Sequence, residues 1–153
     1  MSDPITYQAT STRFGLPFLF AAQSQREFFV NEALARIDCA LHPVIDGELA
    51  APPANPGEGA VWLVAPGATG AWAGHDGDLA AFDAGAWTFV APQPGMRAWE
   101  RVAARAMVFS NGVWLRPEPP ADPVGGTSID TEARAAIINL IASLRHAGIF
   151  SAA

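Results

Sequence analysis

The sequence predicts a mainly β protein with flanking helices. A small antiparallel β domain built of hairpins should follow an N-terminal arm and helix, and should precede an amphipathic C-terminal helix. Two features of the composition favour this class. The 153 residues include 14 Gly and 13 Pro, which favour many turns and short strands over a helical bundle. Five Trp and nine Phe suit the pleated, half-buried surfaces of strands.

The first segment, 1–45, is predicted to hold an arm, an apolar plug and a helix. Residues 1–14 are mostly polar and cannot form a core of their own, so we expect an extended arm that another part of the assembly, such as a second chain, holds in place. Residues 15–20 are apolar, and Pro17 fixes one φ angle there. The candidate assembly contacts in this plug fill either the subunit's own core or a groove of a neighbour; they are Phe18, Leu19 and Phe20.

The helix of this segment is expected from about residue 24 to residue 41, where Pro43 stops it. Cys39 falls in an apolar pattern and is the only cysteine, so we predict a buried, inert thiol and no intrachain disulfide. The apolar residues at helical spacing are Phe28, Leu34, Ile37 and Leu41. The acidic residues are interpreted as a solvated helix face that Arg26 and Arg36 can pair with; they are Glu27, Glu32 and Asp38.

The segment 46–118 is predicted to be the antiparallel β domain. Residues 46–59 form a loop, and six strands follow, at 60–65, 79–83, 86–91, 97–102, 105–110 and 113–117. Ala84-Gly85 and Asn111-Gly112 mark tight turns between strands, and Asn-Gly is the strongest short hairpin signal because both residues accept positive φ. The polar, Gly-rich stretch "GAWAGHDGD" (70–78) is a loop that could carry ligand contacts.

A weak repeat of the form Phe-x-x-Gly-x-Trp occurs in this domain, at "FDAGAW" (82–87) and "FSNGVW" (109–114). One interpretation is two similar hairpins, each with a cross-strand aromatic pair. The alternative is a row of platforms that stack on sugar rings, with Trp72, Trp87 and Trp114 as candidates. The acidic residues near the hairpin loops lack the spacing of calcium loops and read as solvated turn acids; they are Asp76, Asp78 and Asp83.

Residues 119–127 are a Pro-rich, then Gly-rich linker, and the segment 128–153 carries the clearest helix of the sequence, from 128 to 147. Thr127, Ser128 and Asp130 are candidate N-caps, and Gly148 stands at the C′ position. This apolar helix packs either on its own β domain or against the same helix of other subunits. The candidate oligomer contacts are Ile137, Leu140, Ile141 and Leu144.

Composition and missing motifs exclude several function classes. The net charge of −6 and the absence of any basic cluster argue against nucleic-acid binding. His42, His75 and His146 show no ligand spacing, and no catalytic motif is present, so we expect no metal, no cofactor and no enzymatic activity. The first twelve residues lack a basic residue and no apolar run approaches 20 residues. We therefore expect no signal peptide and no membrane insertion.

The stretches "GLPFL…AAQSQREFFVNEALARID" (15–38) and 51–102 carry a distinctive set of motifs: Gly-Leu-Pro, Ala-Gln-x-Gln, Asn-Glu-Ala-Leu, Gly-Ala-Trp-x-Gly and the Gly-x-Trp hairpins. Over roughly residues 14–116 the chain resembles a family of unknown biochemical activity from bacteriophages, prophages and the gene transfer agents of alphaproteobacteria. The segment 131–150 is similar to a helix that ends many phage fibre and spike proteins.

This resemblance implies a structural component of a virion or phage-like particle, of spike, tail-fibre or tail-tip adaptor type. It implies no catalytic residues, and it implies a chain that is made in the bacterial cytoplasm and incorporated into the particle. The expected partners are further copies of the chain, as a trimer or in another symmetry, and neighbouring virion proteins. The alternative function is a carbohydrate-binding module for attachment to host-surface polysaccharide, through the Trp-bearing hairpins.

Overall fold

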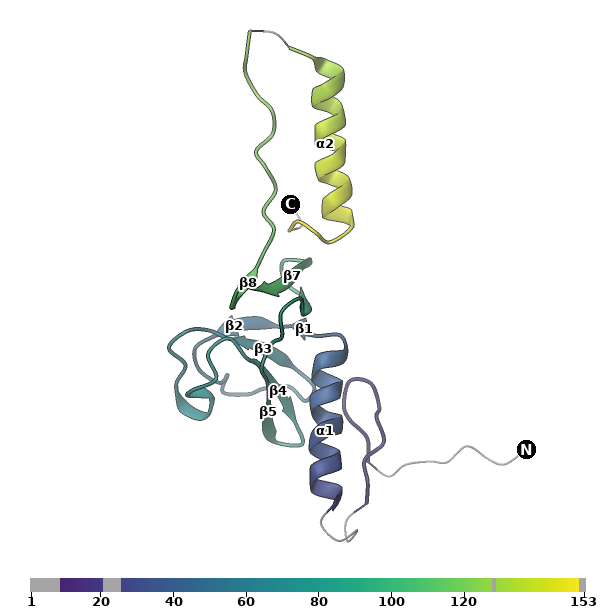
Figure 1. Cartoon of the computed structure of the whole chain (residues 1–153), viewed down its shortest axis with the longest axis vertical. Coiled ribbons are helices and arrows are strands. Elements are labelled where there is room, and N and C mark those ends of the chain that lie inside the picture. The colour runs from purple at the N-terminus through teal and green to yellow at the C-terminus, as the bar shows by residue number, and fades with distance from the viewer. Residues whose placement is uncertain (1–8, 21–25, 128, 152–153) are drawn as a thin grey trace, which may run out of the picture. The chain divides into compact units, whose positions relative to one another are not determined.

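The computed structural model describes residues 9–20, 26–127 and 129–151. Its contacts divide the chain into two compact units, Met1–Pro92 and Gln93–Ala153, with a boundary inside the segment 46–118. The predicted class is confirmed: the protein is mostly β, with helix α1 (Arg26–Leu41) before the strands and helix α2 (Thr131–His146) after them (Figure 1). Each unit is described below by itself.

In the first unit, the described part of the arm folds back on itself. Thr10 and Pro17 form an antiparallel bridge, and the backbone N–H of Phe18 donates to the carbonyl of Ala9 at 2.9 Å. Gly15 has a φ of 64°, the left-handed conformation that the tip of this turn requires. Residues 9–20 are therefore a small hairpin and not an extended strand.

The carboxylate of Asp38, near the end of α1, binds this hairpin. Its Oδ1 accepts from the hydroxyl of Ser11 at 2.5 Å and from the N–H of Phe14 at 2.8 Å, and its Oδ2 accepts from the N–H of Arg13 at 3.2 Å. Ser11 and Asp38 are both buried. A buried carboxylate with several donors is strongly held, because each bond to a charged group is worth more than a neutral one.

Arg13 from the same hairpin caps the C-terminal end of α1. Its Nη1 donates to the carbonyls of Asp38 at 2.9 Å and Cys39 at 3.1 Å, and its Nη2 donates to the carbonyl of His42. The last turn of α1 contains no basic residue of its own. The guanidinium thus supplies both the donors and the positive charge that the end of a helix lacks.

These contacts correct the expected orientation of α1. Asp38 and Glu27 were assigned to a solvated face but are only 5% and 7% exposed, whereas Arg36 and Glu32 do pair on the surface at 2.6 Å. Phe28 is 70% exposed, and the other large apolar residues that point outward are Phe29, Val30, Ile37 and Leu41. The spacing of apolar residues in the sequence identified residues that share a face of the helix. The hydrogen bonds between the hairpin and Asp38 decided which face is covered.

The described part of the plug, residues 15–20, is hydrogen-bonded to α1 of the same chain, so no second chain is needed to hold it in place. The side-chain amide of Asn31 makes two hydrogen bonds with the backbone of Leu19. Its Oδ1 accepts from the N–H of Leu19 at 2.8 Å, and its Nδ2 donates to the carbonyl of Leu19 at 3.1 Å. Phe18 and Leu19 are half-buried, and Phe20 is exposed. Residues 1–8, the first part of the predicted arm, lie outside the described residues.

The sheet of this unit has the strand order β2-β3-β4-β5. Strands β3 (Val61–Val64), β4 (Leu79–Asp83) and β5 (Ala86–Val90) pair antiparallel as predicted. Strand β2 (Gly47–Leu49) pairs parallel to β3, a departure from a purely antiparallel domain. Sequence reasoning missed β2 and the two-residue β1 (Val44–Ile45), because elements so short carry no periodicity. A 3-10 turn, η1 (Gly70–Trp72), lies between β3 and β4.

Cys39 is 1% exposed in this unit, which confirms the predicted buried thiol. Burial, which disfavours the thiolate, raises its pKa to about 11.

The second unit contains β6 (Arg97–Glu100), β7 (Arg105–Ser110) and β8 (Val113–Leu115), which pair antiparallel in that order. The side chain of Asp130 caps α2 by accepting from the N–H of Ala133 at 2.8 Å. This result selects Asp130 among the predicted caps, although residue 128 lies outside the described residues. At the other end Gly148 has a φ of 69°, as predicted for C′, and its carbonyl accepts from the N–H of Ala106 on β7.

Replacing Asp38 with Ala should lower the free energy of unfolding by about 2–4 kcal/mol, because the buried hydroxyl of Ser11 and the part-buried N–H groups of Arg13 and Phe14 lose their acceptor. Urea denaturation followed by Trp fluorescence measures the change. Glu32→Ala removes an exposed carboxylate from the same helix and should cost less than about 0.5 kcal/mol. Equal effects of the two substitutions would contradict the anchoring role of Asp38.

Replacing Gly148 with Ala should destabilise the second unit by about 2–4 kcal/mol, because a Cβ there would overlap the ring of Trp99 in addition to straining the backbone. Gly125→Ala is the matched control, since Gly125 also has a positive φ, of 79°, but nothing lies near its Cβ position. Thermal unfolding of both variants separates overlap from strain. If both shift the midpoint equally, the contact with Trp99 is unimportant.

Candidate functional site

Three Trp rings of the first unit gather on one face of its sheet. The centroids of Trp72 and Trp87 are 5.0 Å apart at 88°, and Trp62 lies 5.8 Å from Trp87 and 6.4 Å from Trp72. Edge-to-face pairs of this kind add stability beyond the area that they bury. Trp72 is 0% exposed, so it belongs to the core and offers no free ring face to a sugar. Its predicted role as a stacking platform does not hold.

The two repeats form the predicted cross-strand aromatic pairs. Phe82 stands opposite Trp87 with ring centroids 4.9 Å apart, and Phe109 stands opposite Trp114 at 5.4 Å. Both turns use positive φ, at 51° and 75° for Ala84-Gly85 and at 51° and 80° for Asn111-Gly112. Trp87 and Trp114 stay half-exposed, so their binding of sugars remains a prediction.

A pocket of about 510 Å³ lies beside β5 in the first unit. Helix α1 contributes Glu32 and Arg36, the loop after η1 contributes His75 and Asp78, and β5 contributes Trp87 and Phe89. Because β5 is the last strand in the order of its sheet, the pocket flanks a sheet edge. Aromatic and polar groups converge there, which is typical of a small-molecule site.

The His75 ring is held in place on two sides. It stacks on Phe89 with centroids 3.6 Å apart and 6° between the planes, and its Nδ1 lies 2.9 Å from Oδ2 of Asp78. With Nδ1 as the donor to Asp78, Nε2 is left as an acceptor. The loop that carries this pair is braced by Asp76, whose oxygens accept from the N–H groups of Gly67 and Ala68 at 2.9 Å each. These two bonds lower the pKa of Asp76.

The structure revises the roles of the loop carboxylates. Asp76 and Asp78 make the contacts just described, and Asp83 accepts from the hydroxyl of Thr12, so none of the three is simply a solvated turn acid. Within the described parts of the chain, no group of three or more His, Cys, Asp or Glu side chains is arranged to hold a metal ion.

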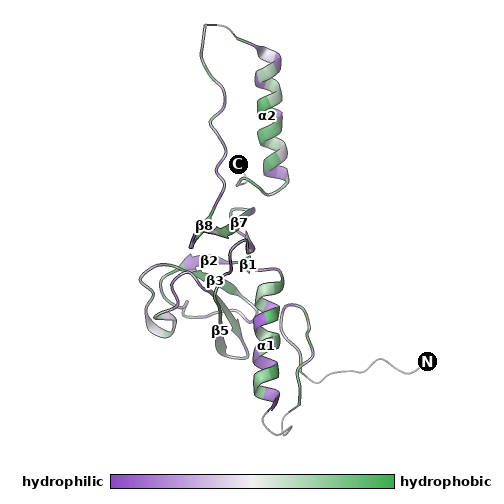
Figure 2. Cartoon of the chain, in the orientation of Figure 1, coloured by the Kyte–Doolittle hydropathy of each residue, from purple (hydrophilic) through white to green (hydrophobic). Residues whose placement is uncertain are grey.

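A second candidate surface lies on α2. Ile137, Ile138 and Leu140 are 44%, 46% and 59% exposed, while Ile141 is buried in its own unit. No charged residue occurs between Arg134 and Arg145. Figure 2 shows the middle turns of this helix as predominantly hydrophobic. Neither this helix nor α1 is long and apolar enough to cross a membrane, and the same holds for every described helix.

A family model described as "Protein of unknown function (DUF2793)" matches residues 30–115, more than half of the chain. The chain belongs to the DUF2793 family. No curated protein matches this DUF2793 chain. The matched region runs from Val30, in the second turn of α1, to the end of β8. It therefore contains the pocket and both aromatic hairpins, whereas the N-terminal hairpin and α2 lie outside it.

Sequence reasoning on this DUF2793 protein identified Trp87 as a candidate site residue, but not the other seven residues that line the pocket. The loop 70–78 was noted as polar and Gly-rich, and the spacing of His75 and Asp78 within it was the available signal. Glu32 and Arg36 could not be found, since they read as an ordinary surface pair on a helix.

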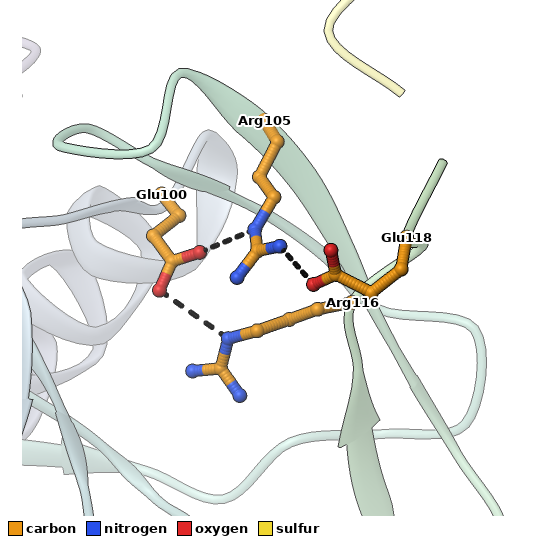
Figure 3. A network of polar contacts seen from close by, with 4 residues as sticks. All are labelled: Glu100, Arg105, Arg116 and Glu118. Carbon is orange, nitrogen blue, oxygen red and sulfur yellow. Dashed lines mark hydrogen bonds and ion pairs between the residues drawn. The ribbon is translucent and has the colours of Figure 1, made fainter. Parts of the chain in front are cut away.

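The second unit holds a polar network across its strands (Figure 3). Glu100 accepts from Nε of Arg105 at 2.8 Å and from Nε of Arg116 at 3.3 Å, and Arg105 also donates to Glu118 at 2.5 Å. Burial alone would raise the pKa of Glu100, but the two guanidinium groups outweigh it and lower the pKa. The network ties β6, β7 and the segment after β8 together.

Replacing Glu100 with Gln should lower the free energy of unfolding at pH 7 by about 1–3 kcal/mol. Because the folded pKa of Glu100 lies below the ordinary value of 4.5, its stabilisation is complete above pH 4.5 and disappears as the pH falls through the folded pKa. Urea titrations between pH 7 and pH 3 should therefore show the gap between wild type and variant closing at low pH. Glu118→Gln, at a 67% exposed carboxylate, should have a much smaller effect.

Proposed function

We propose that this DUF2793 protein is a non-enzymatic structural component of a bacteriophage or phage-like particle, of spike, tail-fibre or tail-tip adaptor type, which forms homo-oligomers through α2. The particle assignment rests on the sequence resemblance over residues 14–116. The observation that carries the assembly role is the apolar seam of α2, defined as Ala133, Ile137, Leu140 and Leu144.

The spacing of the seam, four, three and four residues, is that of a coiled coil. Three of its members are exposed in the single chain and Leu144 is half-buried. A helix of 16 residues is too short to be stable through its backbone alone, so an exposed apolar seam favours packing against a second helix. Every further copy of the chain carries the same helix and can provide this partner. We therefore propose self-association as the mode of assembly.

Exposed aromatic side chains near the N-terminus fit a second, heterologous contact with a neighbouring particle protein. Phe14 and Phe20 of the hairpin are exposed, as are Phe28 and Phe29 at the start of α1. Anchoring by Asp38 holds this hairpin in shape before any partner arrives, which lowers the entropic cost of docking.

Leu140→Glu should convert the homo-oligomer into monomers, because it puts a charge into the seam at a side chain that is 59% exposed in the single chain. Sedimentation or light scattering of the full chain gives the mass. Asn139→Glu adds the same charge at the neighbouring, exposed position outside the seam and should leave the mass unchanged. A monomeric wild type, or an oligomer that survives Leu140→Glu, would contradict assembly through α2.

A further inference from the structure

We propose that the pocket beside β5 binds a neutral pyranose sugar, with the ring of Trp87 as the stacking surface and Arg36, Asp78 and His75 as the hydroxyl-binding groups. This function goes beyond assembly and does not depend on it. The pocket volume of about 510 Å³ lies in the range of small-molecule sites. Every residue that lines it belongs to the first unit, so the site is complete within one chain.

The aromatic part of the pocket is held in advance of any ligand. Trp87 forms a T-shaped pair with the buried ring of Trp72, with centroids 5.0 Å apart, yet it remains half-exposed and lines the pocket. Phe89 and His75 form the stacked pair on the same wall. An apolar aromatic face matches the C–H-rich face of a pyranose, and an ordered ring loses little entropy on binding.

The polar part of the pocket combines donors and acceptors. Arg36 offers N–H donors, Glu32 and Asp78 offer carboxylate acceptors, and His75 offers Nε2 when its Nδ1 donates to Asp78. A sugar hydroxyl both donates and accepts, so vicinal hydroxyls suit such a mixed set. A purely apolar ligand would desolvate the remaining donors and acceptors of these groups without pairing them.

Charge favours a neutral sugar over an acidic one. Two carboxylates and one guanidinium line the pocket, so a uronic acid or a phosphate would meet more negative than positive charge. The net charge of the whole chain, −6, acts in the same direction by repelling polyanions.

The test is a titration of the full chain with maltotriose, cellotriose, mannotriose and oligogalacturonate, followed by calorimetry or Trp fluorescence. We expect at least one neutral trisaccharide to bind and the galacturonate not to bind. Ala91→Trp fills the pocket from an exposed position on its rim and should weaken binding at least tenfold. Arg36→Ala, at an exposed side chain, should also weaken binding at least tenfold through lost donors.

Two controls keep the outcomes distinct. Ala54→Trp adds the same bulk at an exposed loop residue of the same unit, and Trp114→Ala removes the other half-exposed candidate ring. Both should bind like the wild type. The proposal is overturned if no neutral sugar binds, if only the galacturonate binds, or if binding survives both Ala91→Trp and Arg36→Ala. Loss of binding in Trp114→Ala alone would move the site to the second hairpin and overturn the assignment as well.

Discussion

The buried carboxylate of Asp38 is the contact on which the first unit depends, because it joins the N-terminal hairpin to the end of α1. Three donors of that hairpin converge on it, and the neighbouring Arg13 completes the same helix end. A buried charge is stable only when its hydrogen bonds are made. The hairpin therefore occupies the polar face of α1, and the apolar side chains Phe28, Phe29 and Leu41 are left on the outside.

The covering of the polar face of α1, with apolar residues left exposed, has functional consequences. Asp38 anchors the C-terminal end of α1 to the hairpin. The helix then presents Glu32 and Arg36 to the pocket beside β5, and large apolar residues to the solvent. Large exposed apolar side chains of this kind are candidates for contact with another protein. One element therefore serves both the proposed sugar pocket and the proposed contact with a neighbouring protein.

The two units rely on different interactions. The first contains a cluster of Trp rings, of which Trp87 lines the pocket. The second relies on the network of Glu100 with two arginines and on the close approach of Gly148 to Trp99. The seam of α2 uses none of these contacts, so breaking the proposed oligomer need not unfold either unit. The proposed assembly and the proposed sugar binding are therefore separable by mutation.

Local chemistry in the sequence determined the class, α2 with Gly148 at its C-terminal end, the six later strands and both aromatic hairpins, whereas the structure selected Asp130 among three candidate N-caps. Those signals act over a few residues, through turn conformations and cross-strand pairs. Only the tertiary structure decided that Trp72 is core, that Asp38 is buried, that β2 runs parallel to β3 and that His75 meets Phe89. These features depend on contacts between segments that are distant in the sequence. The periodicity of hydrophobic residues does not indicate which face of a helix or of an aromatic ring such a segment will cover.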